Sequence, residues 1–207
     1  MLLYYITDRR QFAGNEREQR EQLLLKISQA ARSGVDLIQL REKDLSPREL
    51  EGVARQAIEN IRVARTRTRL LVNSRVDVAL AVRADGVHLR SRDISPAEVR
   101  RIWDLANGSG QPIIAVSCHN EEEVLGAAAA GANYAVLGPI FEKAETSQVL
   151  GLKLLRAACR HTISVLALGG IRVENAHSCI AAGAQGVAGI RLFQEGPIAQ
   201  IAKELRS

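Results

Sequence analysis

Aromatic residues are scarce in this sequence, which contains one Trp, three Tyr and three Phe among 207 residues. Single-stranded nucleic acids are usually bound by stacking bases on aromatic side chains, so the composition argues against that class despite a formal net charge of +5. The densest basic run is interleaved with Thr and Ala and precedes an apolar segment; it comprises Arg62, Arg65, Arg67 and Arg69. We interpret the run as a solvated helix end and loop, with a DNA-binding arm as the alternative, and expect no nucleic-acid partner.

Long apolar runs are lacking too, since no stretch approaches the roughly 18 residues that span a bilayer. The apolar segment Met1–Ile6 meets Asp8 and two arginines too soon to be a secretory signal. We therefore expect a cytoplasmic protein with no membrane partner. The three cysteines, Cys118, Cys159 and Cys179, are odd in number and lack the spacing of metal ligands, which argues against a disulfide framework and against structural zinc.

The remaining composition is that of a soluble globular protein, with 46% hydrophobic and 25% charged residues. The length is close to the roughly 200 residues at which a single α/β barrel can close. No linker or change of composition divides the chain. We therefore predict one domain over residues 1–207.

Apolar runs of strand length alternate with helical patterns along the whole chain. The predicted strands are Leu2–Thr7, Val35–Arg41, Leu70–Asn73, Gly86–Arg90, Pro112–Ser117, Tyr134–Ile140, Ser164–Gly169 and Gly186–Ile190. The predicted helices are Arg17–Ser33, a helix opened by Ser46 and Pro47, Val76–Arg83, a helix opened by Ser95 and Pro96, Glu121–Ala130, Leu152–Cys159, Val173–Ala182 and Pro197–Leu205. Eight strand-then-helix units are the number in a closed (β/α)8 TIM barrel, with a doubly wound open sheet as the alternative.

Glycine follows three of the predicted helices two or three residues before the next strand, at Gly34, Gly131 and Gly183. Glycine in this place commonly adopts the left-handed conformation that ends a helix. The same helix-to-strand connection is therefore repeated within the chain, which supports the predicted alternation of strands and helices.

Polar and glycine residues follow the carboxyl ends of the predicted strands, where the active sites of such barrels lie. The seventh strand ends at Gly169 and Gly170, and the eighth ends at Gly189 and Ile190. Backbone N–H groups at these two positions, near a helix N-terminus, form the phosphate site common to these barrels. A tight strand-to-helix turn is the alternative explanation for Gly169 and Gly170.

Two cations, Arg41 and Lys43, follow Leu37–Leu40, the apolar part of the second predicted strand. Arg binds a carboxylate or phosphate through two parallel hydrogen bonds, and Lys binds as a point charge. The two side chains are therefore candidates for clamping an anionic substrate. The alternative is a solvated loop in which Glu42 and Asp44 neutralise them.

Histidine supplies the candidate acid–base group. His119 ends the fifth predicted strand, and its ordinary pKa lies near neutrality, as general acid–base catalysis requires. A structural role is the alternative for His119. His88 is the weaker candidate, because its apolar surroundings equally fit a place in the barrel wall, and His161 and His177 fall on predicted helices as surface residues.

Seven motifs spread over essentially the whole chain resemble the thiamine phosphate synthase/TenI superfamily. They are Tyr5-Ile6-Thr7-Asp8, Ile38-Gln39-Leu40-Arg41-Glu42-Lys43, Val72-Asn73, Ala84-Asp85-Gly86-Val87-His88-Leu89, Val116-Ser117-Cys118-His119, Leu137-Gly138-Pro139-Ile140-Phe141 and Ala167-Leu168-Gly169-Gly170-Ile171. The resemblance implies a TIM barrel acting in thiamine biosynthesis on a small-molecule thiazole phosphate. It also implies that Gln39, Asn73 and Ser117 contact the substrate.

One activity of this superfamily is the synthase reaction, which couples hydroxymethylpyrimidine pyrophosphate to thiazole phosphate with Mg²⁺ held by two aspartates. The first aspartate position is Ser74 here, whereas the second is Asp93. Synthases also carry a Pro-Thr-x-Thr-Lys loop that grips the pyrophosphate; this chain has Thr146 at the Lys position, with Lys143 nearby as a partial substitute for binding substrate. Glu142 and Glu145 add negative charge to that loop.

These departures make the sequence resemble the TenI branch, the thiazole tautomerase, more closely. That enzyme is an isomerase that needs no metal, and its Ser-x-His motif corresponds to Ser117 and His119. The resemblance implies that His119 moves a proton on a thiazole phosphate carboxylate, with Arg41 and Lys43 on the carboxylate and the glycine amides on the phosphate. Arg191 replaces a small residue of the family, and either strengthens phosphate binding or points away.

Three functions therefore stand as predictions. Thiazole tautomerase without a cofactor is preferred, and thiamine phosphate synthase with Mg²⁺ at Asp93 is the alternative. A non-catalytic, regulatory protein that binds a phosphate ligand is the third. The sequence leaves the oligomeric state open, with a homodimer as one candidate.

Overall fold

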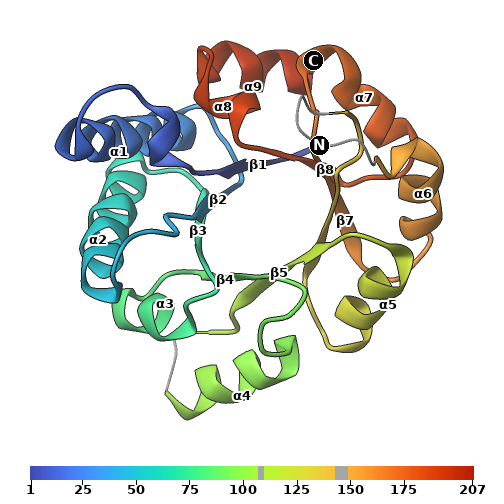
Figure 1. Ribbon diagram of the computed structural model, residues 1–207, viewed down its shortest axis with the longest axis horizontal. Helices are drawn as coiled ribbons and strands as arrows, with labels where there is room; N and C mark the ends of the chain where they lie inside the picture. Colours follow the sequence, from blue (N-terminus) through green and yellow to red (C-terminus); the bar gives the residue numbers. More distant parts are fainter. Residues whose placement is uncertain (107–109, 143–148) are drawn as a thin grey trace.

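Eight parallel strands close into a barrel in a computed structural model that describes residues 1–106, 110–142 and 149–207 (Figure 1). Each strand pairs with its neighbours in chain order, and β1 pairs with β8 to close the ring. The strands are β1 (Leu2–Ile6), β2 (Leu37–Leu40), β3 (Arg69–Asn73), β4 (Gly86–Leu89), β5 (Ile113–Cys118), β6 (Tyr134–Leu137), β7 (Ser164–Leu168) and β8 (Gly186–Gly189). The predicted TIM barrel is confirmed, and the open-sheet alternative is wrong.

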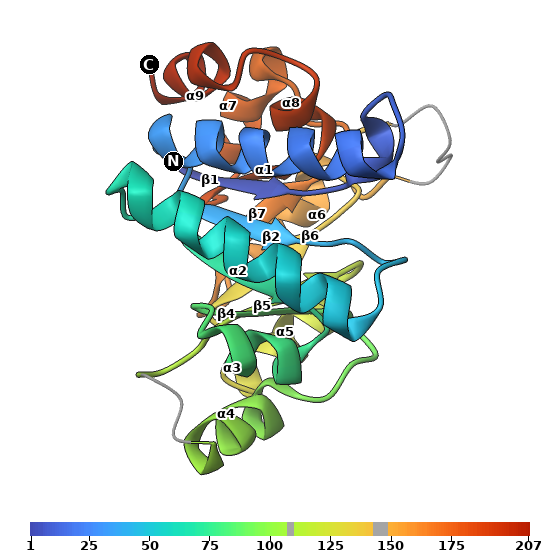
Figure 2. The same cartoon turned by 90° about the vertical axis from the view of Figure 1, so that its left-hand side faces the viewer.

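Helices surround the barrel on the outside (Figures 1 and 2). They are η1 (Arg9–Gln11), α1 (Glu16–Arg32), α2 (Pro47–Ala64), α3 (Val76–Val82), α4 (Pro96–Leu105), α5 (Glu121–Ala129), α6 (Gly151–Ala158), α7 (Val173–Ala181), α8 (Arg191–Gln194) and α9 (Ile198–Arg206). Their inner faces pack on the outer face of the barrel in one apolar core. Within the described ranges, no helix combines the length and apolar character that a membrane crossing demands.

The helix boundaries follow the capping chemistry of the sequence. Ser46 accepts a hydrogen bond from the N–H of Glu49, whose carboxylate accepts the N–H of Ser46 in return at 2.9 Å. Ser95 likewise caps α4 by accepting the N–H of Glu98 at 3.2 Å. The three glycines that end helices all have positive φ: 75° at Gly34, 82° at Gly131 and 105° at Gly183. The two Ser-Pro helix starts and the three left-handed helix ends predicted from the sequence are therefore confirmed.

The interior of the barrel changes from apolar to polar toward the carboxyl ends of the strands. Successive inward side chains are two residues apart along a strand. Three strands pass from an apolar residue to a polar one in one such step: Leu37 to Gln39, Leu71 to Asn73, and Ala115 to Ser117. His88 of β4 joins this polar layer. The barrel interior is thus filled by apolar side chains, and toward the carboxyl ends of the strands these are covered by a layer of polar side chains, here called the polar floor.

Six of the predicted strands are longer than the observed ones by one to three residues, and the sixth and eighth strands show why. The strand predicted as Tyr134–Ile140 ends at Leu137. A side chain at Gly138 would place its Cβ 2.2 Å from the carbonyl oxygen of Leu168, so the chain passes close to β7 here. The strand predicted to end at Ile190 ends at Gly189, because Ile190 already caps the short, unpredicted α8.

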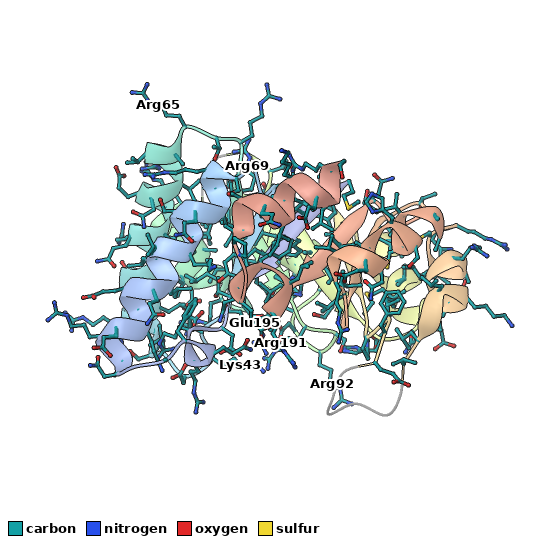
Figure 3. All side chains as sticks on the ribbon, turned by 90° about the horizontal axis from the view of Figure 1, so that it is seen from above. Lys43, Arg65, Arg69, Arg92, Arg191 and Glu195 are labelled. Atoms are coloured by element: carbon teal, nitrogen blue, oxygen red, sulfur yellow. The ribbon has the colours of Figure 1, made fainter. Side chains whose placement is uncertain are left out.

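The basic run between α2 and β3 lies at the amino ends of the strands. Arg62 belongs to the last turn of α2, and Arg65 is the residue that ends it. Figure 3 shows Arg65 and Arg69 at one end of the molecule and Lys43, Arg92 and Arg191 at the other. The run is therefore a helix end and loop, as interpreted from the sequence, except that Arg69 already begins β3, and it is remote from the strand ends where a site was predicted.

Candidate active site

A cavity of about 1050 Å³ opens at the carboxyl ends of the strands. Twelve predicted site residues line it, drawn from six of the eight strands or the loops after them: Gln39, Arg41, Lys43, Asn73, Asp93, Ser117, His119, Gly169, Gly170, Gly189, Ile190 and Arg191. Lys143 lies outside the described residues, as do Glu145 and Thr146 of the same loop. The barrel topology thus brings into one place residues that are far apart in the sequence.

The acidic neighbours of Arg41 and Lys43 turn away from them. Glu42 and Asp44 instead bind Arg9, whose Nη1 lies 3.3 Å from Glu42 Oε2 and 2.7 Å from Asp44 Oδ1. Within residues 1–106, 110–142 and 149–207, neither Arg41 nor Lys43 has an ion-pair partner, and both border the cavity. The solvated-loop alternative therefore fits poorly, because the loop's carboxylates neutralise Arg9 instead.

Thr7 at the end of β1 fixes the backbone of this loop. Its hydroxyl donates to Glu42 Oε1 at 2.5 Å and accepts the N–H of Arg41 at 2.9 Å. Burial raises the pKa of Glu42, while the hydrogen bonds from Thr7 and Arg9 act in the opposite direction. A buried polar cluster thus holds the loop that presents Arg41 to the cavity.

A chain of hydrogen bonds runs across the polar floor from β2 to the loop after β4. Gln39 Nε2 donates to Asn73 Oδ1 at 2.9 Å, and Asn73 Nδ2 donates to Ser74 Oγ at 3.2 Å. Ser74 in turn donates to Asp93 Oδ2 at 2.6 Å. The Ser74 hydroxyl is therefore connected to the Asp93 carboxylate and helps to orient it.

Arg90 occupies the other side of the same carboxylate. Its Nη2 lies 3.0 Å and its Nε 3.1 Å from Asp93 Oδ1, and its backbone N–H donates to Oδ2 at 2.8 Å. Burial acts to raise the pKa of Asp93, but the hydrogen bonds from Ser74 and Arg90 outweigh it and leave the pKa lowered. The carboxylate is charged at neutral pH, and the side chain of its partner Arg90 is 68% exposed.

His88 lies beneath the cavity floor, where it is 2% exposed. Burial lowers its pKa to about 3, and the charge of Arg41 adds to the effect. Its two ring nitrogens lie 2.9 Å from the Tyr4 hydroxyl and 2.8 Å from Ser117 Oγ. His88 therefore has a place in the barrel interior, as its sequence context allowed, and is neutral at physiological pH.

His119 lies at the rim of the cavity, beyond the end of β5. Its side chain is 59% exposed, and Nδ1 is 3.1 Å from Oε2 of Glu123 in the first turn of α5. Glu123 also accepts the backbone N–H of His119 at 2.8 Å. The imidazole is thus within reach of a ligand in the cavity, but it is far more solvated than His88.

Both glycines at the turn after β7 are required by the backbone. Gly169 has φ of 98° and Gly170 has φ of 64°, conformations that L side chains rarely adopt. A Cβ on Gly170 would lie 2.7 Å from the carbonyl oxygen of Glu142. The tight-turn explanation is therefore sufficient for these glycines, and phosphate binding by their N–H groups stays a prediction.

Further cations in the cavity wall were not singled out from the sequence. Arg90 and Arg92 follow β4, and Arg172 precedes α7. Among the described residues, six cations line the cavity against four acids: Arg41, Lys43, Arg90, Arg92, Arg172 and Arg191 against Asp93, Glu142, Glu174 and Glu195. The signal that could have identified them is position, since each follows the carboxyl end of a strand, where side chains reach the cavity.

A family model described as thiamine monophosphate synthase matches residues 3–193. The chain belongs to this family. It is 39% identical over 195 residues to the thiamine-phosphate synthase of Chloroflexus aurantiacus, covering 90% of this chain and 82% of that one. It is 35% identical over 189 residues to the thiamine-phosphate synthase of Clostridium novyi, covering 89% and 86% of the two chains.

A solved structure agrees with these sequence relatives. Thiamine phosphate pyrophosphorylase from Pyrococcus furiosus superposes with a TM-score of 0.82 at 31% identity, covering 99% of this chain and 93% of that one.

These relatives overturn the predicted preference for an isomerase. The thiazole tautomerase prediction is wrong, because the matching proteins named above are thiamine-phosphate synthases or a pyrophosphorylase. The prediction gave too much weight to Ser74 and Thr146. Ser74 still supports Asp93 through a 2.6 Å hydrogen bond, and Thr146 lies outside the described residues. The proton-shuttle role of His119 belonged to the tautomerase reaction and is withdrawn with it.

Proposed function

We propose that this protein is a thiamine phosphate synthase, a transferase that couples hydroxymethylpyrimidine pyrophosphate to thiazole phosphate. The coupling forms a carbon–nitrogen bond between the two rings and breaks the carbon–oxygen bond to pyrophosphate, which leaves with the electron pair. Such a reaction needs one cavity that holds two phosphorylated molecules and stabilises the charge on the leaving group. The observation that carries the proposal is the cationic cavity, whose cations come from opposite sides of the barrel mouth.

The two sides of the cavity offer two anion sites. On one side are Arg41 and Lys43 after β2, and Arg92 after β4. On the other are the Gly169–Gly170 turn and Arg191 at the start of α8. Because β4 and β8 are half a barrel apart, Arg92 and Arg191 can bind separate phosphates, and β2, which Arg41 and Lys43 follow, lies two strands from each. We assign the pyrophosphate to the first side and the thiazole phosphate to the second.

The protein's own residues contribute binding, orientation and charge stabilisation. Arg41 and Lys43 place positive charge where the leaving pyrophosphate gains negative charge, and fixed charges of this kind are an effective means of lowering a barrier. Gln39, Asn73 and Ser117 present amide and hydroxyl groups at the cavity floor, where they can orient a polar heteroaromatic ring. Holding both rings in one orientation also reduces the entropy that the coupling step would lose.

The oxygen donors beside Arg90 fit a magnesium ion that arrives with the pyrophosphate. Mg²⁺ is usually bound through one or two carboxylates together with substrate phosphates, and it keeps several waters. The Asp93 carboxylate borders the cavity, and the Ser74 hydroxyl lies 2.6 Å from it, so the two provide neighbouring hard oxygen donors. Asp93 and Ser74 would hold the ion. When bound, Mg²⁺ would neutralise part of the negative charge on the leaving group.

The test is formation of thiamine phosphate from the two substrates with Mg²⁺, followed by chromatography. We expect product with Mg²⁺ and little or none after treatment with EDTA, and restored activity when Mg²⁺ is added back. Omitting either substrate in turn provides the control. Failure of correctly folded protein to form product, with binding of thiazole phosphate intact, would instead favour a non-catalytic phosphate-binding protein.

A further inference from the structure

A buried phenol is connected to the cavity by two hydrogen bonds. Tyr4 of β1 is fully buried inside the barrel, and its hydroxyl lies 2.9 Å from Nδ1 of His88. The other ring nitrogen, Nε2, lies 2.8 Å from Oγ of Ser117, which borders the cavity. The chain Tyr4–His88–Ser117 therefore runs from the core to the place where a ligand would bind.

The protonation states of the first two members are set by burial. Desolvation lowers the pKa of His88 to about 3, so the imidazole is neutral and carries a single N–H at physiological pH. Desolvation also raises the pKa of the Tyr4 hydroxyl, which keeps its proton. The proton of His88 is then on Nδ1 or on Nε2, and the two tautomers reverse the direction of every hydrogen bond in the chain.

The surroundings of Tyr4 favour one of these tautomers. If Nδ1 carried the proton and donated to Tyr4, the phenolic O–H would need another acceptor, and the described part of the chain provides none. A buried donor without a partner is disfavoured by a factor of about ten to a hundred in population. Tyr4 therefore donates to Nδ1, and His88 carries its proton on Nε2 and donates to Ser117.

We propose that Tyr4 is a positioning residue that keeps the His88 proton on Nε2 and thereby makes Ser117 a hydrogen-bond donor to the substrate. Because Ser117 Oγ already accepts from His88, its own O–H is left to donate into the cavity. In the opposite tautomer that O–H would be used on His88, and Ser117 could only accept. The arrangement selects a substrate that presents a lone pair at this position, such as a ring nitrogen, over one that presents an N–H. The inference about the substrate rests on the proposed function, whereas the inference about the His88 tautomer does not.

Nuclear magnetic resonance of the substrate-free protein tests the tautomer directly. With ¹⁵N-labelled histidine, long-range ¹H–¹⁵N correlations distinguish the two ring nitrogens of His88, which the His88→Gln variant assigns. We expect a single Nε2–H tautomer in the wild type. In Tyr4→Phe, which keeps the ring and removes the hydroxyl, we expect the signals to move toward a mixture of tautomers. A wild-type Nδ1–H tautomer, or an unchanged Nε2–H tautomer in Tyr4→Phe, would overturn the proposal.

Kinetics supply the second measurement, with a matched control on the neighbouring residue. Tyr5 is equally buried, and its hydroxyl donates to Gln194 Oε1 at 2.9 Å on the outer side of the strand, away from the cavity. We expect kcat/KM for thiamine phosphate formation to fall about tenfold in Tyr4→Phe and to stay within about twofold in Tyr5→Phe. Equal activity of the two variants, at equal thermal stability, contradicts the role of Tyr4. If the wild type forms no thiamine phosphate, the proposed function fails, and the NMR result still decides the tautomer.

Discussion

The two ends of the barrel use charged and polar side chains in opposite ways. At the amino end, acidic or amide side chains that precede β2, β4 and β6 bind N–H groups of the strand before. Asp36 accepts the N–H of Leu3 at 2.8 Å, and Asp85 accepts that of Leu70 at 2.8 Å. Asn133 repeats the pattern by accepting the N–H of Ile114 at 2.9 Å.

Arginines complete the amino-end arrangement. Arg206 lies 2.8 Å from Asp36, Arg69 lies 2.8 Å from Asp85, and Arg100 lies 3.2 Å from Asn133. At the carboxyl end, by contrast, Arg41 and Lys43 face the cavity while the neighbouring carboxylates bind Arg9. Cations paired with strand-capping groups thus stabilise the barrel, whereas cations left without such partners are available for an anionic ligand.

The largest effect is expected from removing a cation at the carboxyl end. Arg41→Ala should lower kcat/KM for thiamine phosphate formation by about 100-fold, because a charge-assisted contact to phosphate is lost, and should leave the melting temperature nearly unchanged. Arg69→Ala, an arginine removed from the amino end, is the control and should keep kcat/KM within about twofold. Similar losses of activity in both variants would erase the distinction between the two ends.

A smaller effect, on stability instead of activity, is expected from Asp85. Asp85→Ala removes the acceptor of the Leu70 N–H and the partner of Arg69, and should lower the free energy of unfolding by about 2 kcal/mol. Asp85→Asn keeps an acceptor oxygen, as Asn133 does in the same pattern, and should lose about half as much. Urea unfolding measures both values. Equal destabilisation by Ala and Asn would show that the strand N–H gains nothing from this acceptor.

The smallest effect is expected where the carboxyl end does contain an ion pair. Arg90 competes with a metal ion for Asp93, and the exposed pair contributes little, so Arg90→Ala should strengthen Mn²⁺ binding by about two- to fivefold. Electron paramagnetic resonance of Mn²⁺, used as a probe for Mg²⁺, measures this without turnover. Arg92→Ala removes the same charge from the same loop without touching a bond to Asp93, and should change binding less. Equal changes in the two variants would mean that only the net charge of the cavity matters.

Much of the fold could be predicted from local patterns. The Ser46–Pro47 and Ser95–Pro96 starts, and the glycine ends at Gly34 and Gly131, depend on interactions within a few residues, and the structure has them where the sequence placed them. Strand ends were less accurate, as at Leu137, because a strand ends where its pairing ends, and pairing involves a distant segment.

The candidate site was predicted in position but not in connectivity. Strand-end residues such as Gln39, Asn73 and Ser117 do line one cavity, because the barrel rule converts order along the chain into a common place. The hydrogen bond from Ser74 to Asp93 joins the ends of two different strands, and no spacing pattern in the sequence predicts it. Overlooking that bond made the replacement at Ser74 look like the loss of a site.

The sequence by itself determined the alternation of strands and helices, the helix caps and the family, because these depend on local propensity, hydrophobic period and motif order. Only the tertiary structure decided which charges are neutralised and which are not. Glu42 and Asp44 lie beside Arg41 and Lys43 in the chain, yet in space they bind Arg9. Only the closed barrel brings Tyr4, His88 and Ser117 into contact, because hydrogen bonds and ion pairs act over a few ångströms and neighbours in space come from distant strands.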